Sequence, residues 1–485
     1  MDDTDKLSRW YKYGLIILTC FGFVVTFSYL ITSTSTSTTI YNPVRTTAKR
    51  SSVTSAPPHL VPPSPISSAH LPISVPLPMA HIHAHSYTQL HSFNETFMTF
   101  PWDELETAAA NNLKSERLQL TKLFIDELTY FIEMEPLVPI NENCQPPPLP
   151  SSAEVNCSLY PNAFSGVKRN DSVKIGAILQ LGFDVDVLEI YLHELYGVVD
   201  LFFIIESTHA HFESIRKPLV WERVQRQERF SKFPVVHFII DDAEPMVQSK
   251  DKKWSMEIMQ ERRRWEKFVD WNDQTRFFGV NDVIGFGDAD EIPSRAKLNM
   301  FKYCQLKGES VDFGIWFPFG RIDQAFKTDY PIKGHPYTLG DPTFYTVASA
   351  KALVAKKPNE YPNRKRGKSG NFMLGGMHMT HYGYLPFQLV KYCTATESNM
   401  QTLKDVQKLS SYLRVGDVRE MEAAFAATPK HFERRIIKVD LSKSEMKEIC
   451  VLPWFYDCNR NRYPVWEGGH DTRLDTLIDN KTIEV

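Results

Sequence analysis

A cluster of carboxylates lies in the stretch GFGDADEIPSR, directly after an apolar run that ends at Phe286. Three negative charges this close repel one another unless water, a helix end or a cation offsets them. Asp288 and Asp290, one residue apart in a turn, can both offer oxygen ligands, and such ligands favour Mg²⁺ or Mn²⁺. The pattern therefore predicts a metal site, with an acidic N-terminus of a following helix as the alternative.

Further polar groups lie at predicted strand ends, on the helix before the cluster and beside a pair of glycines. An arginine can bind a diphosphate, a carboxylate can accept from a ribose or a base, and an imidazole can complete a metal shell. The alternatives are a solvated basic face, a capped turn and structural histidines. The expected nucleotide contacts are Glu206, Ser207, Arg262 and Asp288, and the expected metal ligands are Asp288, Asp290, His378 and His381.

These groups require a sheet that brings strand ends together. Strand-like runs alternate with helical stretches, which predicts an α/β domain over residues 171–466 with its active residues at the carboxyl ends of strands. Residues 467–485 contain few apolar side chains and are expected to form a tail. The strands are expected at 173–179, 198–205, 235–240, 282–286 and 312–317, and two of the helices at 186–195 and 252–269.

The residues before this domain have a different composition. The run 13–31 has no charged residue and would span about 28 Å as a helix, enough to cross a bilayer core. A membrane anchor is therefore predicted, with a cleaved signal peptide as the alternative. Basic residues in 1–12 predict a cytosolic tail there and a lumenal location for the rest of the chain.

Residues 32–170 are rich in serine, threonine and proline and are predicted to form a disordered stem. One amphipathic helix is expected at about 101–135, either as a stem element or as a brace on the domain. Glycosylation is expected at the four sequons, Asn94, Asn156, Asn170 and Asn480.

Six of the seven cysteines follow the predicted anchor, and a lumenal compartment would allow up to three disulfides. Cys450 and Cys458 are close enough in sequence to suggest a local bond. The net charge, 55 minus 58 or −3, gives no indication of a nucleic-acid partner.

Three blocks resemble glycosyltransferase family 17. They are FDVDVLEIYLHELYGVVDLFFIIES, the DADEIPSR block and GGMHMTHYGYLPF, and they occur in the family's order. The chain departs from the family pattern at three positions: Asp184 stands for a glutamate, Tyr191 for an arginine and Met377 for a tryptophan.

The resemblance implies a single GT-A-type domain around a mostly parallel sheet. It implies inverting transfer of N-acetylglucosamine from UDP-GlcNAc, β-1,4 to a mannose of an N-glycan core, on a Golgi membrane. We expect Mn²⁺ (or Mg²⁺) as the cofactor and Glu291, Asp323 or Glu397 as the base. The alternatives are another donor or acceptor, a metal-dependent lumenal hydrolase, or a non-catalytic glycan-binding protein.

Overall fold

The computed structural model describes residues 90–211, 215–241, 255–357, 360–379, 384–395, 402–414, 417–421, 436–476 and 478–479. The predicted anchor at 13–31, residues 32–89 of the predicted stem, and His381, Glu397 and Asn480 lie outside these ranges. Among the residues that are described, no helix is long and apolar enough to cross a membrane.

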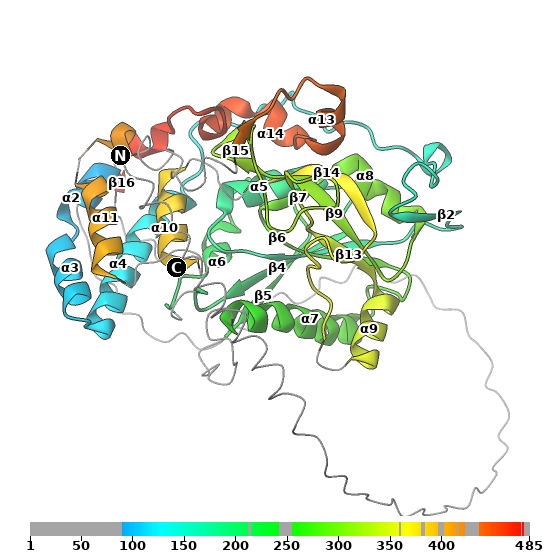
Figure 1. Ribbon diagram of the computed structural model, residues 1–485, viewed down its shortest axis with the longest axis horizontal. Coiled ribbons are helices and arrows are strands. Elements are labelled where there is room, and N and C mark those ends of the chain that lie inside the picture. Colours follow the sequence, from blue (N-terminus) through cyan, green and yellow to red (C-terminus); the bar gives the residue numbers. More distant parts are fainter. Residues whose placement is uncertain are drawn as a thin grey trace, which may run out of the picture. The chain divides into compact units, whose positions relative to one another are not determined.

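A nine-stranded mixed sheet forms the centre of the fold (Figure 1). Its strands follow the order β5-β4-β3-β6-β13-β9-β14-β7, and β12 pairs with β9. The strands are β3 (Ile175–Gln180), β4 (Leu201–Ser207), β5 (Val235–Ile240), β6 (Val283–Asp288), β7 (Glu291–Pro293), β9 (Ser310–Trp316), β12 (Thr338–Leu339), β13 (Thr343–Thr346) and β14 (Phe372–His378).

The sheet combines parallel and antiparallel pairings. Strands β5, β4, β3 and β6 run parallel, and β14 runs parallel to β9. Strand β13 is antiparallel to both of its neighbours, β12 is antiparallel to β9, and β7 is antiparallel to β14. The five strands expected from the sequence are present and the α/β class is confirmed. The expectation of a mostly parallel sheet is wrong, because the added antiparallel strands are too short to show a strand pattern in sequence.

Helices cover both faces of the sheet. Helix α5 (Val185–Leu195) shares one apolar cluster with Phe202 of β4, whereas Phe203, the next residue, belongs to a second cluster with residues of α7 and α9. This alternation follows from the two-residue period of a strand. Helices α7 (Ser255–Thr275) and α9 (Val347–Lys356) lie below the sheet in Figure 1.

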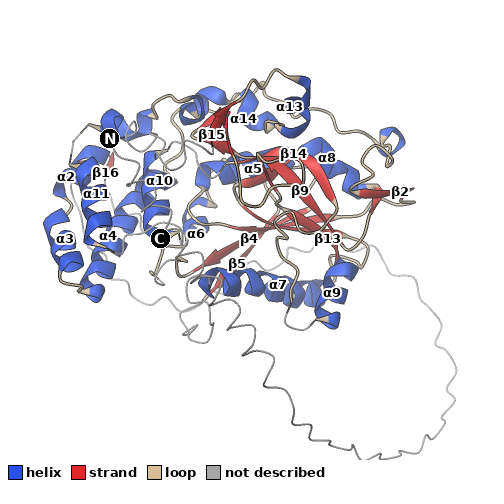
Figure 2. Cartoon of the chain, in the orientation of Figure 1, coloured by secondary structure: helices blue, strands red, loops and turns tan. Residues whose placement is uncertain are grey.

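A group of helices lies beside the sheet (Figure 2). It comprises α2 (Phe93–Thr99), α3 (Trp102–Ala110), α4 (Lys114–Glu133), α10 (Leu385–Thr394) and α11 (Leu403–Leu413). The single helix predicted at about 101–135 is two helices, because Asn112 adopts a φ of 54° that ends α3. Helix α4 packs against α10 and α5 and shares the main apolar cluster with the domain. The structure therefore agrees with the expectation of a brace on the domain and not with that of a separate stem element.

The remaining elements are short. Two small pairings join β2 (Phe164–Lys168) to β8 (Cys304–Leu306) and β1 (Leu90–His91) to β16 (Ile478–Asp479), and β10 (Pro318–Phe319), β11 (Arg321–Phe326) and β15 (Ile436–Lys438) form a three-stranded sheet. The short helices are α6 (Val220–Val224), α8 (Arg295–Asn299), α13 (Ser444–Ile449) and α14 (Trp454–Cys458), with 3₁₀ turns η1 (Ser152–Glu154), η2 (Met300–Lys302), η4 (Arg460–Arg462), η5 (Pro464–Glu467) and η6 (Thr472–Asp475).

Two disulfides tie the segment before β3 to the domain. Cys144 bonds to Cys458, and Cys157 bonds to Cys304. The suggested local bond between Cys450 and Cys458 is wrong. Cys450 has a free thiol, and its backbone pairs with Gly376 of β14 in an isolated β-bridge. Cys458 lies at the end of α14, next to Asn459, whose side chain accepts from the Asn141 N–H.

Glu127 of α4 gives a test of this helix packing. Burial, aided by the charge of Asp126, raises the pKa of Glu127 to about 7, and its Oε2 atom is buried without a hydrogen-bond partner. Because this folded-state pKa lies above the ordinary value of 4.5, stability falls as pH rises from 4.5 to about 7. Glu127→Gln is expected to raise the free energy of unfolding by on the order of 1 kcal/mol at pH 8.

Urea unfolding at pH 8 and pH 4 measures this difference. At pH 4 the carboxyl is protonated in both states, so the substitution should have little effect. Glu116→Gln, at an exposed position of the same helix, is the matched control. An equal effect of Glu127→Gln at both pH values would contradict the assignment.

Candidate functional site

Asp290, Glu291 and His378 meet where β6 turns into β7. The chain leaves β6 at Asp288, turns at Asp290 and enters β7 with Glu291, which lies opposite His378 in the antiparallel pairing with β14. The Met379 N–H donates to the Asp290 carbonyl at 2.8 Å and closes the turn. One backbone pairing thus brings two parts of the sequence to the same point.

The glycine pair before His378 permits this close pairing. Gly376 has a φ of 137°, and a Cβ atom on it would lie 2.4 Å from the carbonyl oxygen of Ile292 in β7. Any side chain there would separate β14 from β7 and move His378 away from Glu291. The glycines therefore serve the approach of two strands.

The three side chains form a donor set that fits a hard divalent cation. One ligand atom from each of Asp290, Glu291 and His378 lies within 4.8 Å of the others, and all three residues are buried. His378 Nε2 lies 3.7 Å from Asp290 Oδ2, and its Nδ1 is buried without a hydrogen-bond partner. Burial lowers the pKa of His378 to about 4 despite the charge of Asp290, so the imidazole is neutral near pH 7, as a metal ligand must be. Two oxygens and one nitrogen suit Mn²⁺ or Mg²⁺.

Asp184 and Lys391 add charge beside this set. Burial and then the charge of Asp290 raise the pKa of Asp184 to about 7, and its buried Oδ1 atom has no hydrogen-bond partner within the described part of the chain. Lys391 Nζ lies 3.7 Å from Asp290 Oδ2. The surroundings of Asp290 therefore combine an unpaired carboxylate oxygen with a nearby ammonium group.

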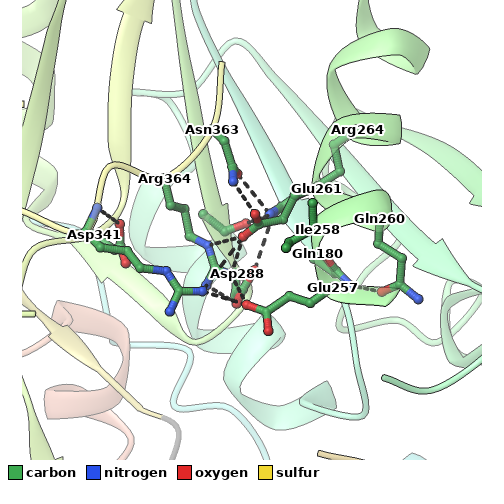
Figure 3. Close-up of polar contacts among 12 residues, drawn as sticks. Gln180, Glu257, Ile258, Gln260, Glu261, Arg264, Asp288, Asp341, Asn363 and Arg364 are labelled. Atoms are coloured by element: carbon green, nitrogen blue, oxygen red, sulfur yellow. Dashed lines mark hydrogen bonds and ion pairs between the residues drawn. The ribbon is translucent and has the colours of Figure 1, made fainter. Parts of the chain in front are cut away.

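Asp288 pairs with two arginines, Arg264 and Arg364, and is not part of the cation set (Figure 3). Arg264 donates from Nη1 to the Gly287 carbonyl at 2.8 Å and to Asp288 Oδ1 at 3.3 Å. Arg364 donates from Nη1 to Asp288 Oδ2 at 2.5 Å. The two aspartates expected to share one metal therefore have different partners, because a two-residue step places each beside a different element.

Arg364 also contacts Glu291 and helix α7. Its Nη1 lies 3.0 Å from Glu291 Oε1, and its Nη2 lies 2.8 Å from Glu261 and 3.3 Å from Glu257. The other oxygen of Glu291 accepts from the Asp288 N–H at 3.0 Å. Burial, with the charge of Asp341, raises the pKa of Glu291 well above its ordinary range.

A polar edge lies next to Asp288 at the carboxyl ends of β3 and β6. Gln180, the last residue of β3, pairs in register with Asp288, and its Nε2 donates to Gln260 of α7 at 2.6 Å (Figure 3). His211 Nε2 lies 2.7 Å from the same Gln260 oxygen. Strand β3 lies between β4 and β6, so the chain order reverses here, and such switch points bind ligands in α/β sheets.

Glu206 and Ser207, two of the predicted nucleotide contacts, are the last two residues of β4. Both oxygens of Glu206 accept backbone N–H groups at the start of α6, from Val220 at 2.7 Å and Trp221 at 3.1 Å, and the residue is fully buried. Glu206 therefore caps the turn that follows β4, which is the alternative that the sequence analysis gave to a nucleotide contact. Ser207 is buried at the end of β4.

Arg262 is exposed and pairs with Glu266. Its position matches the alternative given for this residue, a solvated basic face of the helix. Arg264 is the inward member of the triple arginine. The sequence held a signal for it, since Met256, Gln260, Arg264 and Phe268 recur every four residues and are all buried. Arg364 lies in the loop between α9 and β14, which has no periodicity, and no pattern could have indicated it.

Asp323 lies on β11 in the three-stranded sheet, where it pairs with Arg321 at 3.1 Å, and it takes no part in the cation set.

The described sequons differ in accessibility. Asn156 and Asn170 are exposed, whereas Asn94 is half-buried with its Oδ1 buried. Glycosylation at Asn156 and Asn170 stays a prediction that their exposure allows.

A comparison with models of known protein families finds a match to one family. The model for glycosyltransferase family 17 matches residues 150–315, a stretch that includes Asp184, Asp290 and Glu291. No curated protein matches the chain.

Proposed function

We propose that this chain, in which residues 150–315 match the model for glycosyltransferase family 17, is a glycosyltransferase that transfers N-acetylglucosamine from UDP-GlcNAc. The proposed acceptor is a mannose of an N-glycan core, and the proposed product is a β-1,4 linkage formed with inversion. The observation that carries the proposal is the buried set of Asp290, Glu291 and His378 beside the switch point of the sheet.

The arrangement of side chains supports an orientation for the donor. Gln180 and Gln260 offer amide groups at the carboxyl end of β3, suited to the nucleoside. Asp290, Glu291 and His378 would hold Mn²⁺ (or Mg²⁺) at the diphosphate. The bound cation would neutralise charge that develops on the leaving diphosphate.

The acceptor hydroxyl must lose its proton as it attacks the anomeric carbon. Glu291 already accepts with both oxygens, and Asp323 lies on another sheet. We add Asp184 to Glu291, Asp323 and Glu397 as a proposed base, because its Oδ1 has no hydrogen-bond partner among the described residues and its pKa of about 7, raised by burial and by the charge of Asp290, suits proton transfer at neutral pH.

We also propose a type II protein of the Golgi membrane, with the anchor at 13–31 and the catalytic domain in the lumen. The two disulfides support an oxidising compartment. Protease protection of intact microsomes tests this orientation: the domain should be protected until detergent is added.

The proposed activity is tested with the full-length protein in detergent. Nucleotide sugars and N-glycan acceptors are combined in pairs, with Mn²⁺ or with EDTA, and the product linkage is read by NMR. UDP-GlcNAc should give Mn²⁺-dependent transfer to the core mannose. Phosphoester cleavage without transfer would indicate the hydrolase, and glycan binding without turnover would indicate the non-catalytic alternative.

A further inference from the structure

A buried network of charges surrounds Arg364 (Figure 3). Three arginines form ion pairs with four carboxylates, and a fifth carboxylate, that of Asp341, accepts from the backbone N–H of Arg366 at 3.2 Å. The arginines are Arg264, Arg364 and Arg366, and the carboxylates are Glu257, Glu261, Asp288, Glu291 and Asp341.

Arg364 connects the two parts of this network. Its Nη2 faces Glu261 and Glu257 of α7, while its Nη1 is shared between Asp288 and Glu291. Among the residues that the structure describes, Glu291 alone belongs both to the arginine network and to the cation set. A cation bound by Glu291 would therefore compete directly with the Nη1 atom of Arg364.

We propose that Arg364 is an internal counter-cation that makes the binding of the divalent cation depend on the sugar nucleotide. Without donor, Arg364 neutralises Glu291 and Asp288. With cation and donor present, Nη2 stays on α7 and Nη1 donates to a diphosphate oxygen, a geometry to which the guanidinium fork is suited. This inference rests on the proposed function, and it makes Arg364 a positioning residue in the free protein and a donor contact in the complex.

The consequence is cooperative binding. The cation alone must displace Arg364 from Glu291 and leave its guanidinium without that partner, which weakens binding. The diphosphate supplies the replacement partner, so each ligand should strengthen the binding of the other by the same factor. A purely structural arginine would produce no such coupling.

The test measures Mn²⁺ binding to the full-length protein by electron paramagnetic resonance, with and without UDP. In the wild type, UDP should tighten Mn²⁺ binding about tenfold or more. Arg364→Gln should bind Mn²⁺ alone about tenfold more tightly, lose the coupling, and bind UDP about tenfold more weakly. Arg262→Gln is the matched control, since Arg262 pairs with Glu266 on the exposed face of α7, outside the network, and its replacement should retain the coupling.

Two further readouts keep the result clear. Arg364→Lys keeps the charge but has a single nitrogen, so it should fold, as judged by thermal unfolding, and show reduced coupling. Wild-type coupling in either Arg364 variant overturns the role of Arg364 alone. If the wild type binds no Mn²⁺ even with UDP, the proposed function fails as well.

Discussion

Replacement of Asp290 by asparagine is expected to lower the rate of sugar transfer by about 10²- to 10⁴-fold, because a bound cation contributes several kcal/mol of charge stabilisation. Asparagine has the same shape and leaves the hydrogen bond from the Met379 N–H to the backbone carbonyl unchanged. The neutral amide, however, is a much weaker ligand than a carboxylate. The variant should therefore fold normally and bind Mn²⁺ poorly.

Asp288→Asn distinguishes the structural assignment, in which Asp290 is a metal ligand and Asp288 is not, from the sequence-based expectation that both aspartates bind the metal. Because Asp288 faces Arg264 and Arg364, its replacement should alter their positions and still leave a measurable Mn²⁺ site. Arg262→Gln, on the exposed face of α7, should change neither property. Transfer rates and Mn²⁺ titrations compare the three variants. A greater loss of Mn²⁺ binding in Asp288→Asn than in Asp290→Asn would contradict the structural assignment.

The position of the acidic cluster could be predicted from the sequence, and its partners could not. An apolar run followed by clustered acids indicates a strand end, and the structure confirms that β6 ends at Asp288. Which oxygens face which groups depends on Arg364, 76 residues later in the chain, and on the pairing of β7 with β14. Contacts between distant segments leave no trace in local periodicity.

The fold shows the same division. Longer runs of apolar residues marked β3, β4, β5, β6 and β9, whereas β7 has three residues and β13 has four. The split between α3 and α4 rests on a single residue, Asn112. Residues 467–485, expected to be a tail because they contain few apolar side chains, include the buried residues Arg473 and Leu474. Hydropathy cannot reveal a segment that is held by buried charge.

Replacing Arg473 by methionine is accordingly expected to lower the free energy of unfolding by about 3–5 kcal/mol, the usual effect of removing one partner of a buried ion pair. The side chain is 1% exposed. Its Nη2 lies 2.7 Å from Asp186 of α5 and 2.6 Å from Asp471, and its Nη1 donates to the Met134 carbonyl at 2.8 Å. The methionine variant removes this ion pair from both Asp471 and Asp186, while the pair of Asp186 with Arg229 stays in place.

The pH dependence identifies the cause. Burial alone would raise the pKa of Asp186, but Arg473 and Arg229 outweigh it and hold the pKa below its ordinary value. The wild type therefore keeps this contribution above the unfolded pKa of about 4 and loses it as pH falls through the lower folded value. The difference between Arg473→Met and wild type should be largest near pH 7 and shrink at lower pH, as Asp186 becomes protonated.

Arg460→Met is the matched control for denaturant unfolding, because Arg460 pairs with Asp457 and Glu467 in the same region but is 38% exposed. It should cost no more than about 1 kcal/mol. Equal losses in the two variants would mean that residues 467–476 contribute no more than a surface segment does. A large and pH-dependent loss in Arg473→Met alone would mean that this segment anchors α5, the helix that follows Asp184.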